Sequence, residues 1–200
     1  MIEDQAKRRT VAGGAALAVT AAMLAGCGQA ATPSAPGPSA ERLARVVQLA
    51  AERAAISDRV AAAKFGTGKP VTDPEREAVV VADARAQADR AGVDPDWVTR
   101  VVSDQIAAST QVQNDLLRQW DEHLGSGPSE RPDLAEIRPE ITRISTELVT
   151  ALKGAEPVRT QEDCPSALAA AVRQQAGELD PLHAAALDRA LRSVCSAPTG

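Results

Sequence analysis

Aromatic side chains are nearly absent from this chain, which has one Phe, two Trp and no Tyr among its 200 residues. Runs in which β-branched or aromatic residues alternate with polar ones are also rare, whereas alanine is abundant. Such alternation is the usual signature of a half-buried strand, so its scarcity argues against a β-sheet. The 44% of apolar residues is sufficient for one hydrophobic core. We therefore predict an all-α protein, a single helical-bundle domain of about six helices.

Positive charge is in deficit as well. The chain has 22 Lys and Arg against 27 Asp and Glu, which gives a net charge of −5. An acidic surface repels phosphate backbones, so this balance argues against nucleic acid as a partner. Any basic binding site must therefore be a local pocket within an acidic surface.

Several motifs of catalysis and metal binding are missing from the sequence. It contains no GxSxG element and no Gly-rich phosphate loop, and no nucleophile–base pair can be recognised. The two histidines, His123 and His183, lie in unrelated segments without CxxC or HExxH spacing, so we predict no metal site. Each histidine is expected at the surface or at a helix end.

The N-terminal apolar run, Val11 to Ala25, is about 15 residues long, short of the roughly 20 that a transmembrane helix needs. It follows a cationic segment, Lys7 to Arg9, and it ends where Cys27 directly follows the small residues of Leu24-Ala25-Gly26. We predict that residues 1–26 are a signal peptide. The sequence Leu-Ala-Gly-Cys resembles a bacterial lipobox, which implies lipidation of Cys27.

Two other interpretations of this segment are weaker. An ordinary signal peptide cut elsewhere would leave Cys27 incidental, and the residues after Arg8-Arg9 match a twin-arginine signal poorly. Residues 27–39, rich in Pro, Ser and Ala, are predicted to be a flexible tether to a domain at 40–200. We expect an exported protein, held by its lipid on the outer side of a bacterial cell membrane or released into the periplasm or medium.

Only two further cysteines remain, Cys164 and Cys195. Export leads to an oxidising compartment, so one disulfide between them is expected, although two buried free thiols are the alternative. The bond would close a loop of about 30 residues, a stabilisation of roughly 3–4 kcal/mol in the chain-entropy model. It would brace a C-terminal helical hairpin.

Hydrophobic periodicity and capping signals divide the domain into helices. Asp73-Pro74 and Asp94-Pro95 combine a capping residue with proline in the first turn, and Asp133 resembles the start of a capping box. Pro139 either marks a later start, near Arg138, or kinks the helix. The predicted helices are 40–63, 74–90, 95–124, one from the Asp133 region to about 153, 165–176 and 181–194.

Two cations lie on one face of the first helix. Arg53 and Lys64 are eleven residues apart, which at about 100° per residue returns to within roughly 20° of the same direction. Arg76 follows across a turn, in the first turn of the next helix. A group of cations on helices predicts a pocket for a small ligand with several negative charges.

A family resemblance makes this pocket specific. Arg53–(11)–Lys64–(9)–Asp73–(3)–Arg76–(1)–Glu77, followed by Ser109–(4)–Gln113, resembles the motif of the all-helical AroQ-type chorismate mutases. The signal sequence, the segment VDPDWVTRVVSDQI at 93–106, Arg138 and the two C-terminal cysteines resemble the secreted γ subclass. The resemblance spans about residues 42–195.

The resemblance implies an isomerase that converts chorismate to prephenate by an intramolecular Claisen rearrangement, with no cofactor. Arg53 and Arg138 would hold carboxylates, and Arg76 would lie near the ring hydroxyl and a carboxylate. Lys64 and Gln113 would donate to the ether oxygen. The remaining contacts would come from Ser109, to the ring carboxylate, and from Glu77, to the ring hydroxyl. Asp73 is better explained as a helix cap.

The sequence departs from secreted relatives at two positions, since they often have Glu in place of Gln113, and one has Gln in place of Val80. The resemblance further implies a homodimer in which each protomer holds a whole site, because Arg138 would come from the same chain. The alternative function is a non-catalytic helical lipoprotein that binds a small carboxylate or a partner through the same basic pocket.

Overall fold

The computed structural model describes residues 37–123, 127–175 and 179–195. These residues form six α-helices and one short 3₁₀ helix, with no strand among them, which confirms the all-α prediction. The predicted signal peptide 1–26, the lipidation of Cys27 and the tether up to residue 36 lie outside the described residues. Within the described part, no helix has the length and hydrophobicity to span a membrane.

Most helix bounds agree with the capping signals. The helices are α1 (Pro38–Lys64), α2 (Pro74–Ala91), α3 (Pro95–Glu122), α4 (Leu134–Ala155), η1 (Glu156–Val158), α5 (Cys164–Gln175) and α6 (Pro181–Ala190). Asp73, Asp94 and Asp133 cap their helices, each accepting hydrogen bonds from backbone N–H groups of the first turn.

Several bounds differ from the predictions, and the structure decides the start of α4, which the sequence left open. Pro38 and Ser39, assigned to the tether, already belong to α1, since proline is accepted in a first turn. Helix α4 begins at Leu134 and not near Arg138, because the Asp133 cap starts it before Pro139. Helix α6 ends at Ala190, where Gln105 of α3 donates to the Ala190 carbonyl at 3.1 Å.

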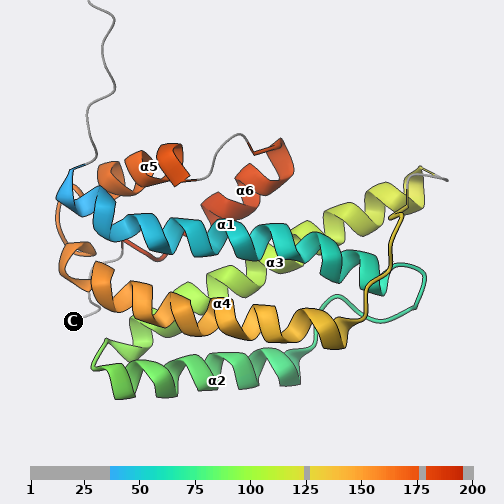
Figure 1. Ribbon diagram of the computed structural model, residues 1–200, viewed down its shortest axis with the longest axis horizontal. Coiled ribbons are helices and arrows are strands. Elements are labelled where there is room, and N and C mark those ends of the chain that lie inside the picture. The colour runs from blue at the N-terminus through green and yellow to red at the C-terminus, as the bar shows by residue number, and fades with distance from the viewer. Residues whose placement is uncertain (1–36, 124–126, 176–178, 196–200) are drawn as a thin grey trace, which may run out of the picture. The chain divides into compact units, whose positions relative to one another are not determined.

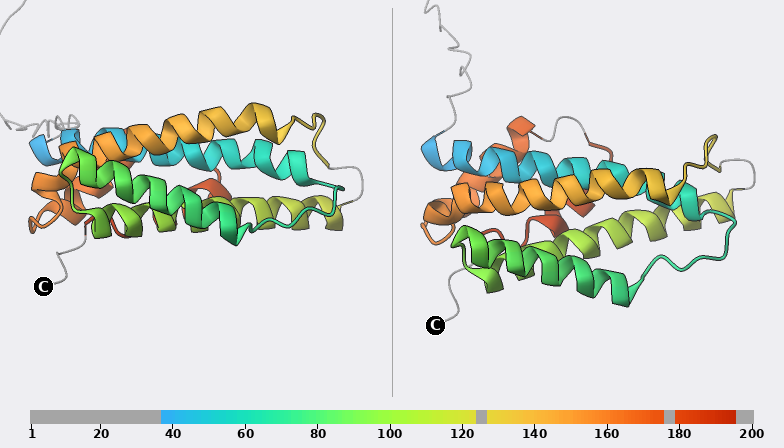
Figure 2. Two further views of the ribbon diagram at one scale, coloured as in Figure 1. Left: turned by 90° about the horizontal axis from the view of Figure 1, so that it is seen from below. Right: turned by 60° about the horizontal axis from the view of Figure 1, so that its bottom comes forward.

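Helix α1 is the helix around which the others pack. It contacts α3, α4, α5 and α6, and α2 packs against α3 and α4 (Figures 1 and 2). The apolar stripe predicted for α1 is fully buried at Leu43, Val46, Val47 and Leu49. Trp97 of α3 is also fully buried, and its indole Nε1 donates to the Ser193 carbonyl at 2.9 Å. The core thus fixes α1 between the helices that supply the rest of the site.

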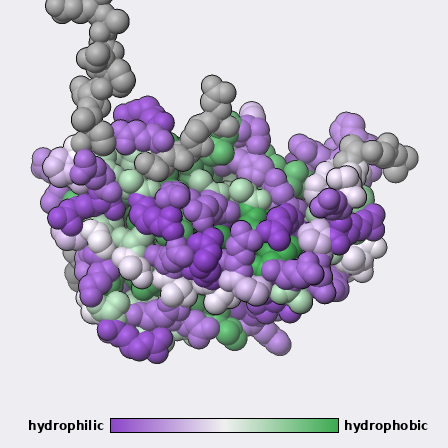
Figure 3. Space-filling model, in the orientation of Figure 1, coloured by the Kyte–Doolittle hydropathy of each residue, from purple (hydrophilic) through white to green (hydrophobic). Residues whose placement is uncertain are grey.

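Charged side chains cover the seam between α1 and α4. Arg45 and Arg143 both pair with Glu52 and with Glu147. Figure 3 shows that polar residues dominate this face of the molecule, with smaller apolar patches between them. Exposed ion pairs add little stability singly, so packing in the core determines how these two helices sit.

The C-terminal region contains the expected disulfide, between Cys164 and Cys195. The two helices between them pack chiefly on other helices, α5 on α1 and α6 on α3 and α1. The bond therefore braces both ends of this segment against the bundle.

His183 lies in the first turn of α6 and joins it to α1. Its Nδ1 is 2.5 Å from Asp180 Oδ2 and its Nε2 is 2.9 Å from Asp58 Oδ1. Burial lowers the pKa of the imidazole, but the hydrogen bonds to Asp180 and Asp58 outweigh burial, and the pKa lies above its ordinary value. This helix-end histidine thus serves packing.

Candidate active site

The predicted cations meet at a cavity of about 190 Å³ enclosed by α1, α2, α3 and α4. Helices α1 and α2 supply its positive charges, and α3 supplies polar side chains. The predicted residues that line it are Arg53, Lys64, Asp73, Arg76, Glu77, Ser109 and Gln113. Segments far apart in the sequence thus form one cavity, and its three cations come together as the helical register of α1 and the cap of α2 predict. The carboxylates of Asp73, Glu77 and Asp83 line the same cavity.

Arg53 is buried without full hydrogen bonding. Only 8% of the residue is exposed to solvent. Its Nη1 donates to Ser145 Oγ of α4 at 3.2 Å. Its Nε is buried and has no hydrogen-bond partner among the described residues. Burial lowers the pKa of the guanidinium to about 10, so it remains charged near neutral pH. Because this unused donor belongs to a cation that lines the cavity, the cavity favours an anionic ligand.

Lys64 is the last residue of α1, and its ammonium is held between two neighbouring segments. Nζ donates to the Val71 carbonyl at 2.7 Å and to Gln113 Oε1 at 3.0 Å. An ammonium has three hydrogens, so one is left for a ligand. Burial lowers the pKa of Lys64, and the carboxylates of Asp73 and Glu77 act in the opposite direction.

The cap of α2 contributes residues to the cavity lining. Asp73 Oδ1 accepts from the Arg76 backbone N–H at 3.1 Å, and Glu77 Oε1 accepts from the Asp73 backbone N–H at 3.2 Å. Asp73 is therefore a helix cap, as predicted. Glu77 shares in the capping and still lines the cavity, while the exposed Arg76 follows directly from the cap.

Arg138 is the one predicted site residue that does not line the cavity. Its side chain is exposed on α4, one turn before Thr142, which does line the cavity. Residues four apart lie on the same side of a helix, so Arg138 and Thr142 face in similar directions. The structure thus brings seven of the motif residues together and leaves Arg138 at the margin.

Sequence reasoning missed several polar groups around the cations. Ser145 accepts from Arg53, the Val71 carbonyl accepts from Lys64, and Asp83 and Thr142 line the cavity. Spacing along one helix cannot reveal these residues, because they come from other elements. Ser57 of α1 was missed too: it is fully buried and lies 2.8 Å from Ser109, measured between the two Oγ atoms.

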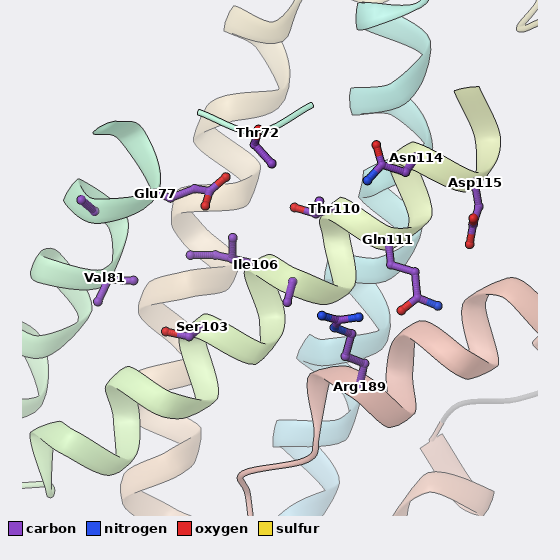
Figure 4. A pocket seen from close by; sticks show the side chains of 12 residues that line it. Thr72, Glu77, Val81, Ser103, Ile106, Thr110, Gln111, Asn114, Asp115 and Arg189 are labelled. Atoms are coloured by element: carbon purple, nitrogen blue, oxygen red, sulfur yellow. The ribbon is translucent and has the colours of Figure 1, made fainter. Parts of the chain in front are cut away.

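A wider groove of about 660 Å³ borders the cavity on the outer face of α3 (Figure 4). Glu77 lines both spaces, and Arg189 reaches into the groove from α6. The groove holds one cation, Arg189, against two carboxylates, Glu77 and Asp115. It is therefore a poorer site for a multiply charged anion than the smaller cavity.

The cavity favours positioning and electrostatic stabilisation as its chemistry. Arg53, Lys64 and Arg76 are cations, and guanidinium and ammonium groups near neutral pH are poor bases. Such a set holds a dianion in one conformer and stabilises negative charge that develops at an oxygen. Among the described residues no cluster of His, Cys, Asp and Glu is suited to a metal ion.

Comparison with known proteins identifies relatives along nearly the whole chain. The family model "Chorismate mutase type II" matches residues 44–114. A "Secreted chorismate mutase" of Mycolicibacterium smegmatis is 35% identical, covering 88% of this chain and 97% of the relative. The "Secreted chorismate mutase" of Mycobacterium tuberculosis is 31% identical, covering 82% and 84% respectively.

Solved structures agree with these sequence matches. The crystal structure of a chorismate mutase from Burkholderia thailandensis superimposes with a TM-score of 0.73 at 38% identity. It covers 77% of this chain and 99% of that chain. The similarity therefore includes the helices that form the cavity.

Proposed function

This chain belongs to the type II chorismate mutases, and we propose that its cavity converts chorismate into prephenate with Arg53, Lys64, Arg76 and Gln113 as the central residues. The observation that carries this proposal is Arg53, a buried guanidinium with an unpartnered Nε beside two further cations. A dicarboxylate would accept a hydrogen bond from this donor and would pair with the cations that line the cavity.

The reaction is an intramolecular rearrangement, in which one C–O bond breaks while one C–C bond forms within the same molecule. No proton or electron enters or leaves, so the enzyme needs to restrain the substrate and to stabilise the charge on the ether oxygen. We assign the free hydrogen of Lys64 to that oxygen, with Gln113 beside it. Preorganised donors of this kind stabilise a transition state without reorganising during the reaction.

The remaining roles concern binding. Arg53 would hold one carboxylate through its free donors, and Arg76 would lie near the other and the ring hydroxyl. Ser109 would contact the ring carboxylate, and Glu77 the hydroxyl. Arg138 would approach from the margin of the cavity, a role supported by the lining position of Thr142 on the same side of α4.

The proposal predicts that the purified domain, residues 37–200 with the disulfide intact, consumes chorismate and forms prephenate without added metal or cofactor. Chorismate loss is followed by absorbance. The product is identified by its unchanged molecular mass and by its acid-catalysed aromatisation. Binding of chorismate without turnover would instead support the non-catalytic lipoprotein that uses the pocket to bind a small carboxylate.

A second prediction concerns Gln113, which cannot titrate. We expect kcat of the native enzyme to stay nearly level between pH 5 and 8, because the amide donates in every protonation state. In Gln113→Glu the new carboxyl must be protonated to donate, yet the Lys64 ammonium, 3.0 Å from Gln113 Oε1, would lower its pKa. The variant should therefore lose about 100-fold in kcat at pH 7 and regain activity as the pH falls.

Gln111→Glu is the matched control, because Gln111 lies on the same helix but lines the outer groove. It adds the same charge and should leave the pH profile level. A Gln113→Glu profile that parallels the native one would remove Gln113 from the ether oxygen.

Export follows from the relatives, which are named secreted chorismate mutases. We further propose that Cys27 is lipidated and anchors the domain on the outer side of the cell membrane through the tether. The support is the Leu-Ala-Gly-Cys sequence after the apolar run. We also propose a homodimer, which the family resemblance implies. A complete cavity in each protomer is supported by the lining, which residues of a single chain form.

A further inference from the structure

We propose that Asp83 is a specificity-determining residue, which weakens the binding of dianions to the cavity and so limits inhibition by the product. Asp83 lines the cavity but has no part in the reaction assigned above. The inference deepens the proposed function and rests on it, because the two dianions concerned are chorismate and prephenate. Its physical basis is repulsion between like charges, without a bond from Asp83 to the ligand.

The three carboxylates that line the cavity are held differently. Asp73 Oδ1 accepts from the Arg76 backbone N–H and Glu77 Oε1 accepts from the Asp73 backbone N–H, so both belong to the cap of α2. Both also interact electrostatically with the Lys64 ammonium. The Asp83 side chain has neither a hydrogen bond nor an ion pair among the described residues. Its negative charge is therefore not offset by a bonded partner.

Asp83 lies toward the end of the cavity that contains Arg53. After the turn that joins them, α2 runs back in the direction opposite to α1 (Figure 1). Arg53 lies eleven residues before Lys64, which is roughly 16 Å back along α1 at 1.5 Å per residue. Asp83 lies seven residues after Arg76, roughly 10 Å along α2 in the same direction. Both side chains line the cavity, so a carboxylate bound to Arg53 is exposed to the field of Asp83.

This repulsion acts on binding and not on the chemical step. Chorismate and prephenate are isomers with the same two carboxylates, so Asp83 raises the free energies of both complexes by similar amounts. The transition state has the same net charge as the bound substrate, and the barrier between them is therefore unchanged. Because Asp83 is exposed, water and salt weaken its interaction with the ligand.

The benefit of weaker binding concerns the product. A cavity that binds its ligand through three cations cannot distinguish substrate from product by charge, so it would bind prephenate as firmly as chorismate. The negative charge of Asp83 lowers both affinities. Prephenate then occupies a smaller fraction of the enzyme at a given concentration, while KM for chorismate is higher.

The experiment measures kcat, KM for chorismate and the inhibition constant Ki of prephenate in Asp83→Asn, which removes the charge with little change in shape. At an ionic strength of about 0.01 M, we expect KM and Ki to fall together by about threefold each, the size of a weak interaction between exposed charges. The value of kcat should change less than about twofold, because uniform binding is what changes. At about 1 M, where the Debye length is about 3 Å, the native and variant constants should converge.

Two control variants separate charge from shape and position. Asp83→Glu retains the charge and should keep KM and Ki close to native. Asp89→Asn removes a carboxylate from the same helix at an exposed position outside the cavity lining, and both constants should again be close to native. A KM of Asp83→Asn at or above the native value would overturn the proposal, as would a decrease that persists unchanged at high salt.

Isothermal titration of prephenate into the native enzyme and Asp83→Asn separates this inference from the proposed function, because it requires no turnover. A native enzyme that does not convert chorismate contradicts the assigned reaction, while the titration still shows whether loss of the Asp83 charge tightens the binding of a dianion. Native turnover with equal prephenate affinities in the two proteins contradicts only the role of Asp83.

Discussion

Replacing Lys64 by alanine is expected to lower kcat/KM for chorismate by about three orders of magnitude, with little change in folding. Removal of one preorganised donor at a developing oxyanion typically costs about 100-fold to 1000-fold in rate, and this donor also carries a full charge. The variant loses the two hydrogen bonds that tie Val71 and Gln113 together, so some disorder of the cavity adds to the effect.

The measurement is steady-state kinetics together with thermal unfolding. Lys69→Ala is the matched control, because it removes an ammonium from an exposed position in the turn after α1. It should retain native kcat/KM. Lys64→Ala turnover within tenfold of native would exclude Lys64 from the breaking bond.

The lowered pKa of Lys64 predicts how activity should depend on pH if Lys64 donates to the ether oxygen. Burial is the main influence and lowers this pKa, so the ammonium loses its proton at a lower pH than an exposed lysine does. Activity that needs the charged form is complete below this pKa and falls as the pH rises through it. We expect this decline in activity at alkaline pH, above the range of pH 5 to 8 in which kcat should stay level because Gln113 does not titrate.

Replacing Arg53 by methionine is expected to have two opposite effects: loss of activity and a gain in stability. Without the guanidinium, one carboxylate of the bound substrate is left unpaired in the cavity, so kcat/KM should fall by about three orders of magnitude. The free protein, however, no longer has to bury a cation whose Nε lacks a partner among the described residues. Replacing poorly paired buried charge by a well-packed apolar side chain often stabilises by about 1–4 kcal/mol.

For a domain of this size, 1 kcal/mol corresponds to about 2–4 °C in Tm. Thermal unfolding without substrate should therefore give a higher Tm for Arg53→Met than for the native enzyme. A saturating dicarboxylate binds the native enzyme but not the variant, and so raises the Tm of the native enzyme alone. The higher Tm of Arg53→Met should then no longer be seen. A Tm of Arg53→Met below that of the native enzyme would show that Arg53 stabilises the fold.

Arg159→Met is the matched control, with the opposite expected sign. Arg159 is also buried with an unpartnered Nη1, but its Nη2 donates to Asp94 at 2.9 Å, and its guanidinium lies 4.7 Å from the Trp97 ring centroid. Removing it leaves Asp94, the cap of α3, without its ion pair, so Tm should fall while kcat changes little. The contrast separates a cation kept for a ligand from one kept for the fold.

The sequence by itself determined the helices and the register of the cations. Asp-Pro pairs started α2 and α3 because the carboxylate satisfies the free N–H groups and proline lacks one, and these effects act within a few residues. The spacing of Arg53 and Lys64 placed both on one side of α1 for the same local reason. The sequence left the start of α4 open, and there the cap at Asp133 prevailed over the disfavoured position of Pro139.

Only the tertiary structure decided which side chains meet the cations. Ser145 and Ser57 are small polar residues on helices, and nothing in their local sequence distinguishes them from other serines. Their partners, Arg53 and Ser109, lie 92 and 52 residues away in the chain. The packing of α1 between α3 and α4 brings these pairs together, and it leaves Arg138 exposed beyond the turn of Thr142. Local propensities act over one or two helical turns, whereas hydrogen-bond partners across helices depend on how whole helices bury their apolar faces.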